Sequence, residues 1–203
     1  EALASAEAEL HAMEARAARA QLNIEEIRAT SQPPRDELSA PLVTSRDFVS
    51  DRIMLDLAGA QERMTAAERA LAEVNRRVTI GTVTETERAE AEIELARARA
   101  VLAILMERRS LRREFVEKGT AAESLALRFE LAQLRTDLEV AQESLRLARV
   151  RFEAVTKQSS VGTATRLELM RAEVELRVRE LELEQLLRRR QRLDAVRRDS
   201  QSQ

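Results

Sequence analysis

The 203-residue chain contains no cysteine, tryptophan or tyrosine, and only four glycines, three prolines and one histidine. Without cysteine it has no disulfides or thiolate metal sites, and such a chain suits a reducing or an oxidising compartment. Because its four phenylalanines are the only aromatic residues, we expect a core of aliphatic side chains. No run of about 18 apolar residues occurs, so the sequence predicts no membrane-spanning helix.

The abundant residues are those of long helices. The chain is 34% charged and 44% hydrophobic, and Ala, Leu, Glu and Arg dominate it. The formal net charge of −2 gives no reason to expect a polyanionic partner. The chain begins at Glu1 already in a helical pattern, so we expect it to be part of a longer protein whose signal peptide or anchor lies outside this sequence.

Two five-residue segments are nearly the same. They are Ile80-Gly81-Thr82-Val83-Thr84 and Val161-Gly162-Thr163-Ala164-Thr165, at an offset of 81 residues (162 − 81). The same offset finds further identical pairs on both sides. Among them are Asp56 and Asp137, Glu87 and Glu168, Leu95 and Leu176, and Leu105 and Leu186. The repeat predicts a duplicated helical hairpin.

Helix-breaking residues between the predicted helices indicate the domain organisation. Paired prolines at positions 33 and 34 end the first helix. The predicted parts are an N-terminal helix over 1–30, a proline-containing linker over 31–44 and a double hairpin over 45–203, with repeat 1 about 45–118 and repeat 2 about 121–199. Short connections make neighbouring helices antiparallel. The predicted fold class is all-α, an elongated antiparallel coiled-coil bundle of two tandem helical hairpins plus an N-terminal helix.

Four predicted helix starts share a threonine with an acid three residues later, the pattern of a capping box. The pairs are Thr44/Asp47, Thr84/Glu87, Thr120/Glu123 and Thr165/Glu168. Gly81, Gly119 and Gly162 follow predicted helix ends, where positive φ favours glycine. We therefore assign the hairpin turns to these glycines, with Thr82 and Thr163.

Gly59 lies inside a predicted helix. It is either a tolerated defect that costs about 1 kcal/mol or a point where a neighbouring backbone comes close, and we slightly favour the second.

Apolar residues form a narrow heptad seam on the N-terminal helix, typical of contact with one partner helix. Its members are Leu3, Leu10, Ala17 and Ile24 in one register, and Ala6, Met13, Ala20 and Ile27 in the other.

The last helix is apolar on two opposite sides. One row is Leu167, Met170, Val174, Val178 and Leu181, and the other is Leu169, Leu176, Leu183 and Leu187. A hairpin partner covers only one side. We expect the second row, Leu169 to Leu187, to contact the other hairpin, the N-terminal helix or another molecule.

Few residues of this chain are candidates for catalysis or metal binding. We interpret His11, the only histidine, as a solvated surface residue because no other histidine or cysteine accompanies it. Acid pairs such as Glu90 with Glu94 and Glu180 with Glu184 have arginine neighbours, which indicates a solvated charged face rather than a catalytic dyad. The sequence lacks phosphate loops and nucleophile motifs. We predict no enzyme, no catalytic or metal site, no cofactor and no small-molecule ligand.

Arginines gather near two predicted helix ends. One group is Arg108, Arg109, Arg112 and Arg113, and the other is Arg188, Arg189, Arg190, Arg192, Arg197 and Arg198. The repeat predicts that both groups lie at one end of the bundle. The favoured interpretation is interaction with helix C-terminal dipoles, and the second is contact with an anionic membrane surface. Nucleic-acid binding is disfavoured because aromatics to stack bases are scarce.

The segments Arg77-Val-Thr-Ile-Gly-Thr-Val-Thr-Glu-Thr-Glu and Val161-Gly-Thr-Ala-Thr-Arg-Leu-Glu-Leu-Met-Arg-Ala-Glu, with Leu147-Ala-Arg-Val-Arg-Phe, resemble the helix–turn–helix tips and preceding helix of the TolC-like outer membrane efflux proteins. The resemblance covers about residues 48–192. That family joins successive helices through membrane strands, whereas here Lys118-Gly119-Thr120 makes the junction directly. Ser159 and Ala164 replace the tyrosine and arginine that some members place beside the tip. The resemblance therefore implies the periplasmic hairpin part and not a channel.

Together these observations predict a non-enzymatic structural or protein-interaction domain of the bacterial envelope, located in the periplasm with or without an anchor outside this sequence. Its partner is a second copy or an envelope protein. The alternative is an extracytoplasmic sensor or spacer of a membrane-anchored regulatory protein, such as an anti-sigma factor or a regulatory metallopeptidase, with the N-terminal helix as a stalk. A third interpretation is an intracellular scaffold.

Overall fold

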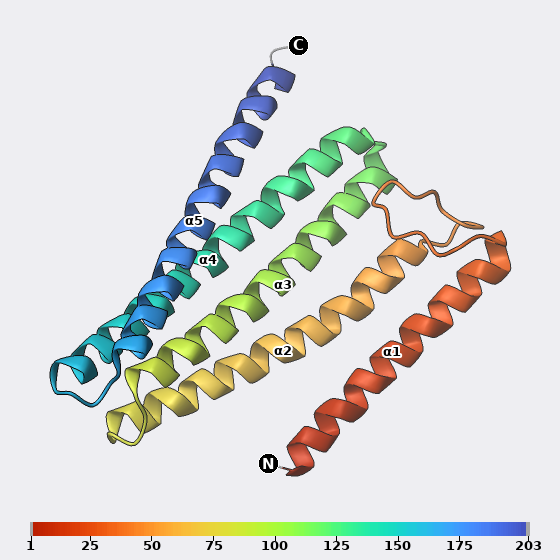
Figure 1. Ribbon diagram of the computed structural model, residues 1–203. Coiled ribbons are helices and arrows are strands. Elements are labelled where there is room, and N and C mark those ends of the chain that lie inside the picture. Colours follow the sequence, from red (N-terminus) through yellow and green to blue (C-terminus); the bar gives the residue numbers. More distant parts are fainter. Residues whose placement is uncertain (1, 202–203) are drawn as a thin grey trace. The chain divides into compact units, whose positions relative to one another are not determined.

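The computed structural model describes the backbone of residues 2–201 and the side chains of residues 10 and 13–198. Five helices make up this part of the chain, and its only β pairing is an isolated bridge between Val43 and Arg46 (Figure 1). The helices are α1 (Ala2–Thr30), α2 (Phe48–Thr79), α3 (Glu85–Lys118), α4 (Ala122–Ser160) and α5 (Arg166–Gln201). The predicted all-α class is confirmed.

The chain forms two compact units, and the division cuts across the helices. Unit 1 contains Glu1–Arg63 and Leu102–Glu130, and unit 2 contains Met64–Val101 and Leu131–Gln203. Helices α2, α3 and α4 therefore each contribute to both units, while the linker belongs to unit 1. Each unit therefore contains parts of both predicted repeats, so the units do not coincide with the repeats.

The capping boxes are confirmed at α3 and α5. The backbone N–H of Glu87 donates to the Thr84 hydroxyl (3.2 Å), and the N–H of Thr84 donates to the Glu87 carboxylate (2.9 Å). Thr165 and Glu168 form the same pair of bonds, at 3.2 and 2.7 Å. Each box satisfies N–H groups that the first helical turn leaves without partners.

The other two predicted boxes are different. Asp47, not Thr44, caps α2 by accepting from the N–H of Ser50 (3.0 Å), so that helix begins at Phe48 rather than near residue 45. The Thr120 hydroxyl donates to Glu114 (3.3 Å). Thr120 thus finds its partner in the preceding helix, α3, and not in Glu123.

The core of unit 1 forms between α2 and the linker. Val49 and Ile53 lie one helical turn apart, are 3% and 1% exposed, and pack with Ala40 of the linker. Leu38 and Leu57 cover this cluster. The linker is therefore part of the folded unit and not a flexible spacer.

The core of unit 2 consists of small and branched aliphatic residues. Ala89 and Ile93 of α3 pack against Leu147 of α4. Ala148 is 1% exposed, and Ala172 of α5 is also buried. Alanine at such positions allows helices to approach closely.

Gly59 in α2 has no atom within 4 Å of the position that a Cβ would occupy. The favoured interpretation, a close neighbouring backbone, is therefore wrong. Gly59 is the tolerated defect.

Candidate functional site

The two repeated turns have the same geometry. Gly81 has φ +73° and Gly162 has φ +76°, which confirms the predicted positive values. The N–H of each glycine donates to the carbonyl three residues earlier, at 2.9 Å from Val78 and 3.1 Å from Ser159. No atom lies within 4 Å of a Cβ placed at either glycine, so glycine is needed for φ and not for packing.

The threonines after these glycines complete both turns. The N–H and the hydroxyl of Thr82 both donate to the Arg77 carbonyl, at 3.0 Å each. Thr163 makes the same two bonds to the Gln158 carbonyl, at 2.9 Å each. Together with the glycine bonds, this is the Schellman arrangement that satisfies the last carbonyls of a helix.

The third predicted turn residue, Gly119, also has positive φ, +64°. Its N–H donates to the Phe115 carbonyl at 2.9 Å. This single bond ends α3 in the simpler left-handed arrangement.

A buried arginine of α2 holds the linker in place. Arg52 is 2% exposed, and its Nη1 donates to Oε2 of Glu26 at 2.6 Å. Its Nε donates to Oδ1 of Asp36 at 2.8 Å, and its Nη2 donates to the carbonyl of Arg35. One guanidinium thus joins α1, the linker and α2.

A second buried arginine, from α3, holds the next part of the linker. Arg112 is 1% exposed and donates through Nη1 to the carbonyls of Leu38 (2.7 Å) and Ala40 (2.6 Å). Its Nε donates to the carboxylate of Asp47 at 2.9 and 3.0 Å. The linker carbonyls need such donors because no strand or helix pairs with them.

Several residues of the first arginine group make contacts within the chain. Arg112 is buried in unit 1, and Arg108 donates to the Asp36 carbonyl (2.9 Å). Arg113 pairs with Glu117 of its own helix. Arg108 and Arg112 therefore take part in the packing of unit 1, whereas Arg113 lies at the surface.

Surface ion pairs surround the buried arginines of unit 1. The hydrogen bond from Arg19 to Asp56 raises the pKa of the Arg19 guanidinium. Hydrogen bonds from Gln21 and Arg46 lower the pKa of the Glu25 carboxyl. Helix α1 is thus fixed to unit 1 by polar contacts.

The described residues of the predicted seam of α1 are exposed. Leu10 and Met13 are 51% and 57% exposed, and Ile24 and Ile27 are both 44% exposed. The described members of the seam therefore do not form the packing face of α1 within unit 1, and the side chains of Leu3 and Ala6 lie outside the described residues.

In unit 2, one arginine connects three helices. Arg151 of α4 donates to Glu90 of α3 (2.7 Å) and to Glu175 of α5 (3.0 Å). The bond to Glu90 raises the pKa of the Arg151 guanidinium. Glu94 pairs with Arg97, so both members of the acid pair at 90 and 94 have arginine partners.

The two apolar rows of α5 are on opposite faces, as predicted, but their exposure distinguishes them. In the row expected to need a partner, Leu169, Leu176 and Leu183 are half-buried and Leu187 is 42% exposed. The opposite row is exposed along its whole length. Its members are Leu167 (56%), Met170 (53%), Val174 (62%), Val178 (43%) and Leu181 (44%). We call these five residues the outer row, and they are the candidate interaction surface.

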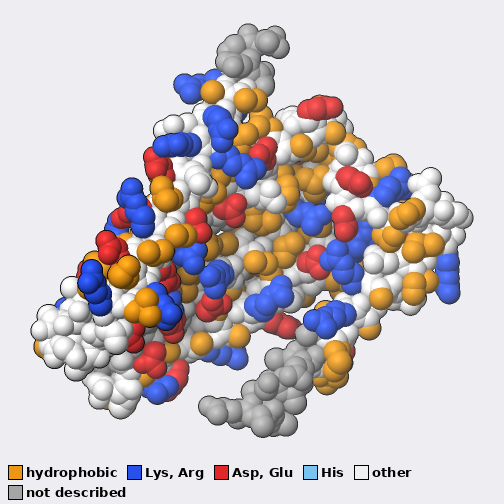
Figure 2. All heavy atoms as spheres, in the orientation of Figure 1, with side chains coloured by type: hydrophobic (Ala, Val, Ile, Leu, Met, Phe, Trp, Pro, Cys, Tyr) orange, Lys and Arg blue, Asp and Glu red, His pale blue; other side chains and the backbone are white. Residues whose placement is uncertain are grey.

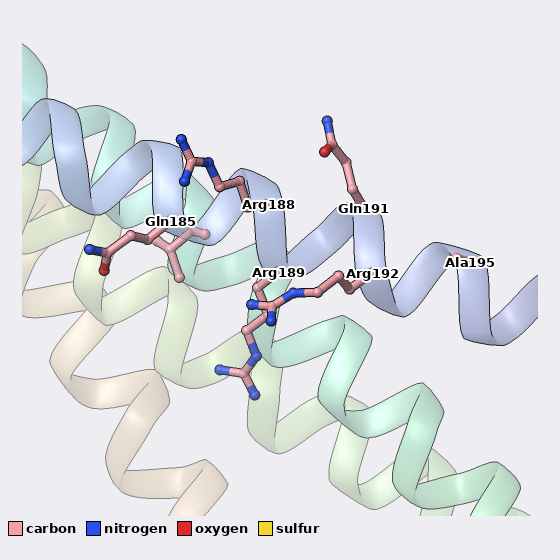
Figure 3. A pocket seen from close by; sticks show the side chains of 7 residues that line it. Gln185, Arg188, Arg189, Gln191, Arg192 and Ala195 are labelled. Carbon is pink, nitrogen blue, oxygen red and sulfur yellow. The ribbon is translucent and has the colours of Figure 1, made fainter.

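The last turns of α5 carry the second arginine group. A shallow hollow is lined there by Gln185, Leu186, Arg188, Arg189, Gln191, Arg192 and Ala195. In Figure 3, Arg189 and Arg192 extend from one side of the helix, and Arg188 and Gln191 from the other. Arg188 pairs with Glu184, and Arg190 with Asp194. Contact of the arginine-rich end with a membrane surface stays a prediction.

Charges of both signs are interspersed on the face of the molecule drawn in Figure 2. Within the part of the chain that the structure describes, no group of three or more acids and histidines is arranged to hold a metal ion. No described helix is long and apolar enough to cross a membrane. The side chain of His11 lies outside the described residues.

A scan against protein-family models finds no match for this chain, and searches of curated proteins and of solved structures find none either.

Proposed function

We propose that this chain is a non-enzymatic protein-interaction domain that works through the outer row of α5. The carrying observation is that one helix is apolar on two faces, with one face half-buried in unit 2 and the other exposed. Five large apolar side chains in a line form the kind of surface that binds another helix. Binding through such a surface requires no catalytic side chain.

The apolar tips of the hairpins are a second part of the proposed contact surface. Ile80 and Val161 occupy the same position in the two repeats and are 71% and 73% exposed. Two turns with the same bonds and exposure support the proposal that the hairpins are a TolC-like element without channel function. On this proposal the domain lies in the periplasm and binds itself or an envelope protein.

The experiment is site-specific photo-crosslinking in the bacterium that encodes the chain. A photoreactive amino acid replaces Val174, and the matched control replaces Val101, a 45% exposed valine of α3. We expect protein crosslinks from position 174 and not from 101, recovered from the periplasmic fraction. Absence of protein crosslinks at 174 would contradict the interaction proposal, and recovery from the cytoplasm would contradict the location.

A second candidate function is a sensor or spacer in a membrane-anchored regulatory protein. The favouring observation is the exposed seam of α1, which has the heptad spacing of a coiled-coil stalk. Proximity labelling from position 24, with the exposed Arg63 of α2 as the control position, tests it. We expect position 24 to label a membrane-anchored regulatory protein that position 63 does not label. Absence of such labelling from position 24 would contradict this function.

A further inference from the structure

The outer row is symmetric about Val174. Met170 and Val178 lie four residues before and after it, and Leu167 and Leu181 lie seven residues before and after it. Rotating the helix by half a turn about an axis through Val174 therefore returns the row onto itself. A row with this symmetry fits a second copy of the same helix running in the opposite direction.

The row is also straight. Leu167 and Val178 are eleven residues apart, as are Met170 and Leu181. Eleven residues complete three helical turns with only about 20° left over. All five side chains consequently face one direction, and two straight helices can meet along the row.

We propose that two copies of this chain associate through the outer rows of their α5 helices, antiparallel, with the symmetry axis at Val174. This inference rests on the proposed function and names the partner as a second copy. Leu167 of one copy packs beside Leu181 of the other, Met170 beside Val178, and Val174 beside Val174. All five residues leave water in such a pair.

The charges beside the row match this alignment. At about 100° per residue, Arg171 and Glu175 flank the row on one side, and Arg177 and Glu173 flank it on the other. In the antiparallel pair, Arg171 lies near Glu175 of the other copy, and Arg177 lies near Glu173 of the other copy. Symmetry makes each of these contacts twice.

A third charge pair extends the match to the end of the row. Arg166 and Glu184 lie on the same side as Arg177. In the antiparallel pair they come within about two residues, or about 3 Å along the axis, of each other in opposite copies. These three types of pair have opposite signs and favour association, whereas Glu168 of one copy comes within about two residues of Glu182 of the other, a like-charge contact that opposes it.

A parallel pair in register would also bring opposite charges together, with Arg171 near Glu173 and Arg177 near Glu175 of the other copy, and it would place Glu182 opposite Glu184. The direction is therefore assigned from the symmetry of the row about Val174, and cysteine crosslinking tests it.

The row is about 21 Å long, because fourteen residues separate Leu167 from Leu181 and each adds about 1.5 Å. A contact of this length is small compared with permanent interfaces. We expect a dimer that dissociates on dilution.

The first test is sedimentation of the full chain over a wide concentration range, up to millimolar. We expect a monomer–dimer equilibrium that Val174→Arg abolishes, because the axis places two guanidinium groups together. Val101→Arg, on another exposed helix surface, leaves the equilibrium unchanged. Equal helicity by circular dichroism shows that both variants are folded. A parent chain that stays monomeric, or a dimer that survives Val174→Arg, would overturn the proposal.

The second test determines whether the two α5 helices run antiparallel. It uses cysteine crosslinking, because the chain has no cysteine of its own. Proteins carrying Leu167→Cys and Leu181→Cys are mixed and oxidised mildly. We expect a disulfide between the two variants and little from either alone. Val161→Cys mixed with Leu181→Cys is the control for random collision. A Leu167→Cys protein that crosslinks to itself as well as the mixture does would overturn the antiparallel alignment.

The two proposals fail in distinguishable ways. A monomeric chain whose position 174 crosslinks in cells to a different protein overturns the dimer but keeps the interaction function. A monomeric chain with no protein crosslink at 174 overturns both.

Discussion

Unit 1 and unit 2 both use segments of α2, α3 and α4, but different residues hold them together. The buried charged residues in the described part of the chain are Glu26, Arg52 and Arg112, and all three belong to unit 1. Unit 2 packs aliphatic residues such as Leu134, Leu138 and Ala148, and its ion pairs lie at the surface. The difference follows from the linker, whose backbone carbonyls need donors when they are covered.

The comparison shows how a loop can be folded without strands. Arginine presents several N–H donors in a fixed plane, so one side chain can reach carbonyls and carboxylates at once. Unit 2 contains only tight turns, whose carbonyls are satisfied locally by glycine and threonine. It consequently needs no buried charge.

The largest expected effect is in unit 1. Arg52→Ala removes the cation 2.6 Å from the buried Glu26 and leaves it only Arg35, at 3.9 Å, so we expect a loss of about 4 kcal/mol in the free energy of unfolding. Chemical denaturation measures it, with Arg63→Ala, an exposed arginine of the same helix, as the control. Equal effects of the two variants would show that the buried charges do not hold unit 1 together.

A somewhat smaller effect is expected from the core of unit 2. Leu138 is 5% exposed, and Leu138→Ala should destabilise by about 3 kcal/mol through lost burial and the cavity left behind. Leu187→Ala, at a position 42% exposed, is the matched control on α5. Thermal unfolding followed by circular dichroism measures both, and a cost at Leu138 no larger than at Leu187 would contradict a core-based unit 2.

The turns of unit 2 should respond to backbone conformation alone. Gly162→Val forces a β-branched residue into positive φ, and we expect a cost of about 1–2 kcal/mol. Gly81→Val should cost a similar amount because the second turn has the same bonds. D-alanine at position 162, introduced by peptide ligation, should be tolerated. Equal damage from valine and D-alanine in denaturation experiments would point to packing instead.

Gly59 offers a gain of stability in unit 1. A methyl group at this position meets no atom within 4 Å, so Gly59→Ala should stabilise the chain by about 1 kcal/mol through helix propensity. The reverse substitution at the exposed neighbour, Ala58→Gly, should cost about the same amount. Chemical denaturation checks the pair, and destabilisation by Gly59→Ala would show that the site is more crowded than this.

The smallest effect concerns pH and the capping boxes of unit 2. The N–H and hydroxyl groups of Thr84 and Thr165 lower the pKa values of the Glu87 and Glu168 carboxyls. A lowered pKa in the folded state gives stability that is present above the unfolded pKa and lost as pH falls through the folded pKa. Glu87→Gln with Glu168→Gln should lower the melting temperature slightly at pH 7, and the difference from the parent should shrink in acid. A difference independent of pH would contradict the assignment to these carboxylates.

Much of the local structure followed from the sequence. The repeated glycine–threonine turns, the positive φ values and the caps at Thr84 and Thr165 depend on residues within about five positions of each other. Their geometry is therefore determined by short segments of the sequence. The two apolar faces of α5 likewise follow from helical periodicity.

Prediction was weaker wherever a partner comes from far along the chain. The Asp47 cap was missed because the Thr44/Asp47 pattern placed the helix start at Thr44, whereas Asp47 itself caps α2 and also accepts from Arg112, which lies 65 residues away. The linker was predicted from its prolines, and nothing in its sequence marks Arg52 and Arg112 as its donors.

The sequence by itself determined the helices, their turns and the existence of two apolar faces on α5, because these depend on backbone preference and periodicity. Only the tertiary structure decided which face of α5 stays exposed, that the described seam residues of α1 are exposed, and that two arginines are buried beside the linker. Burial depends on which distant segments pack against a residue. Rows of similar apolar character can therefore be half-buried on one side of a helix and exposed on the other.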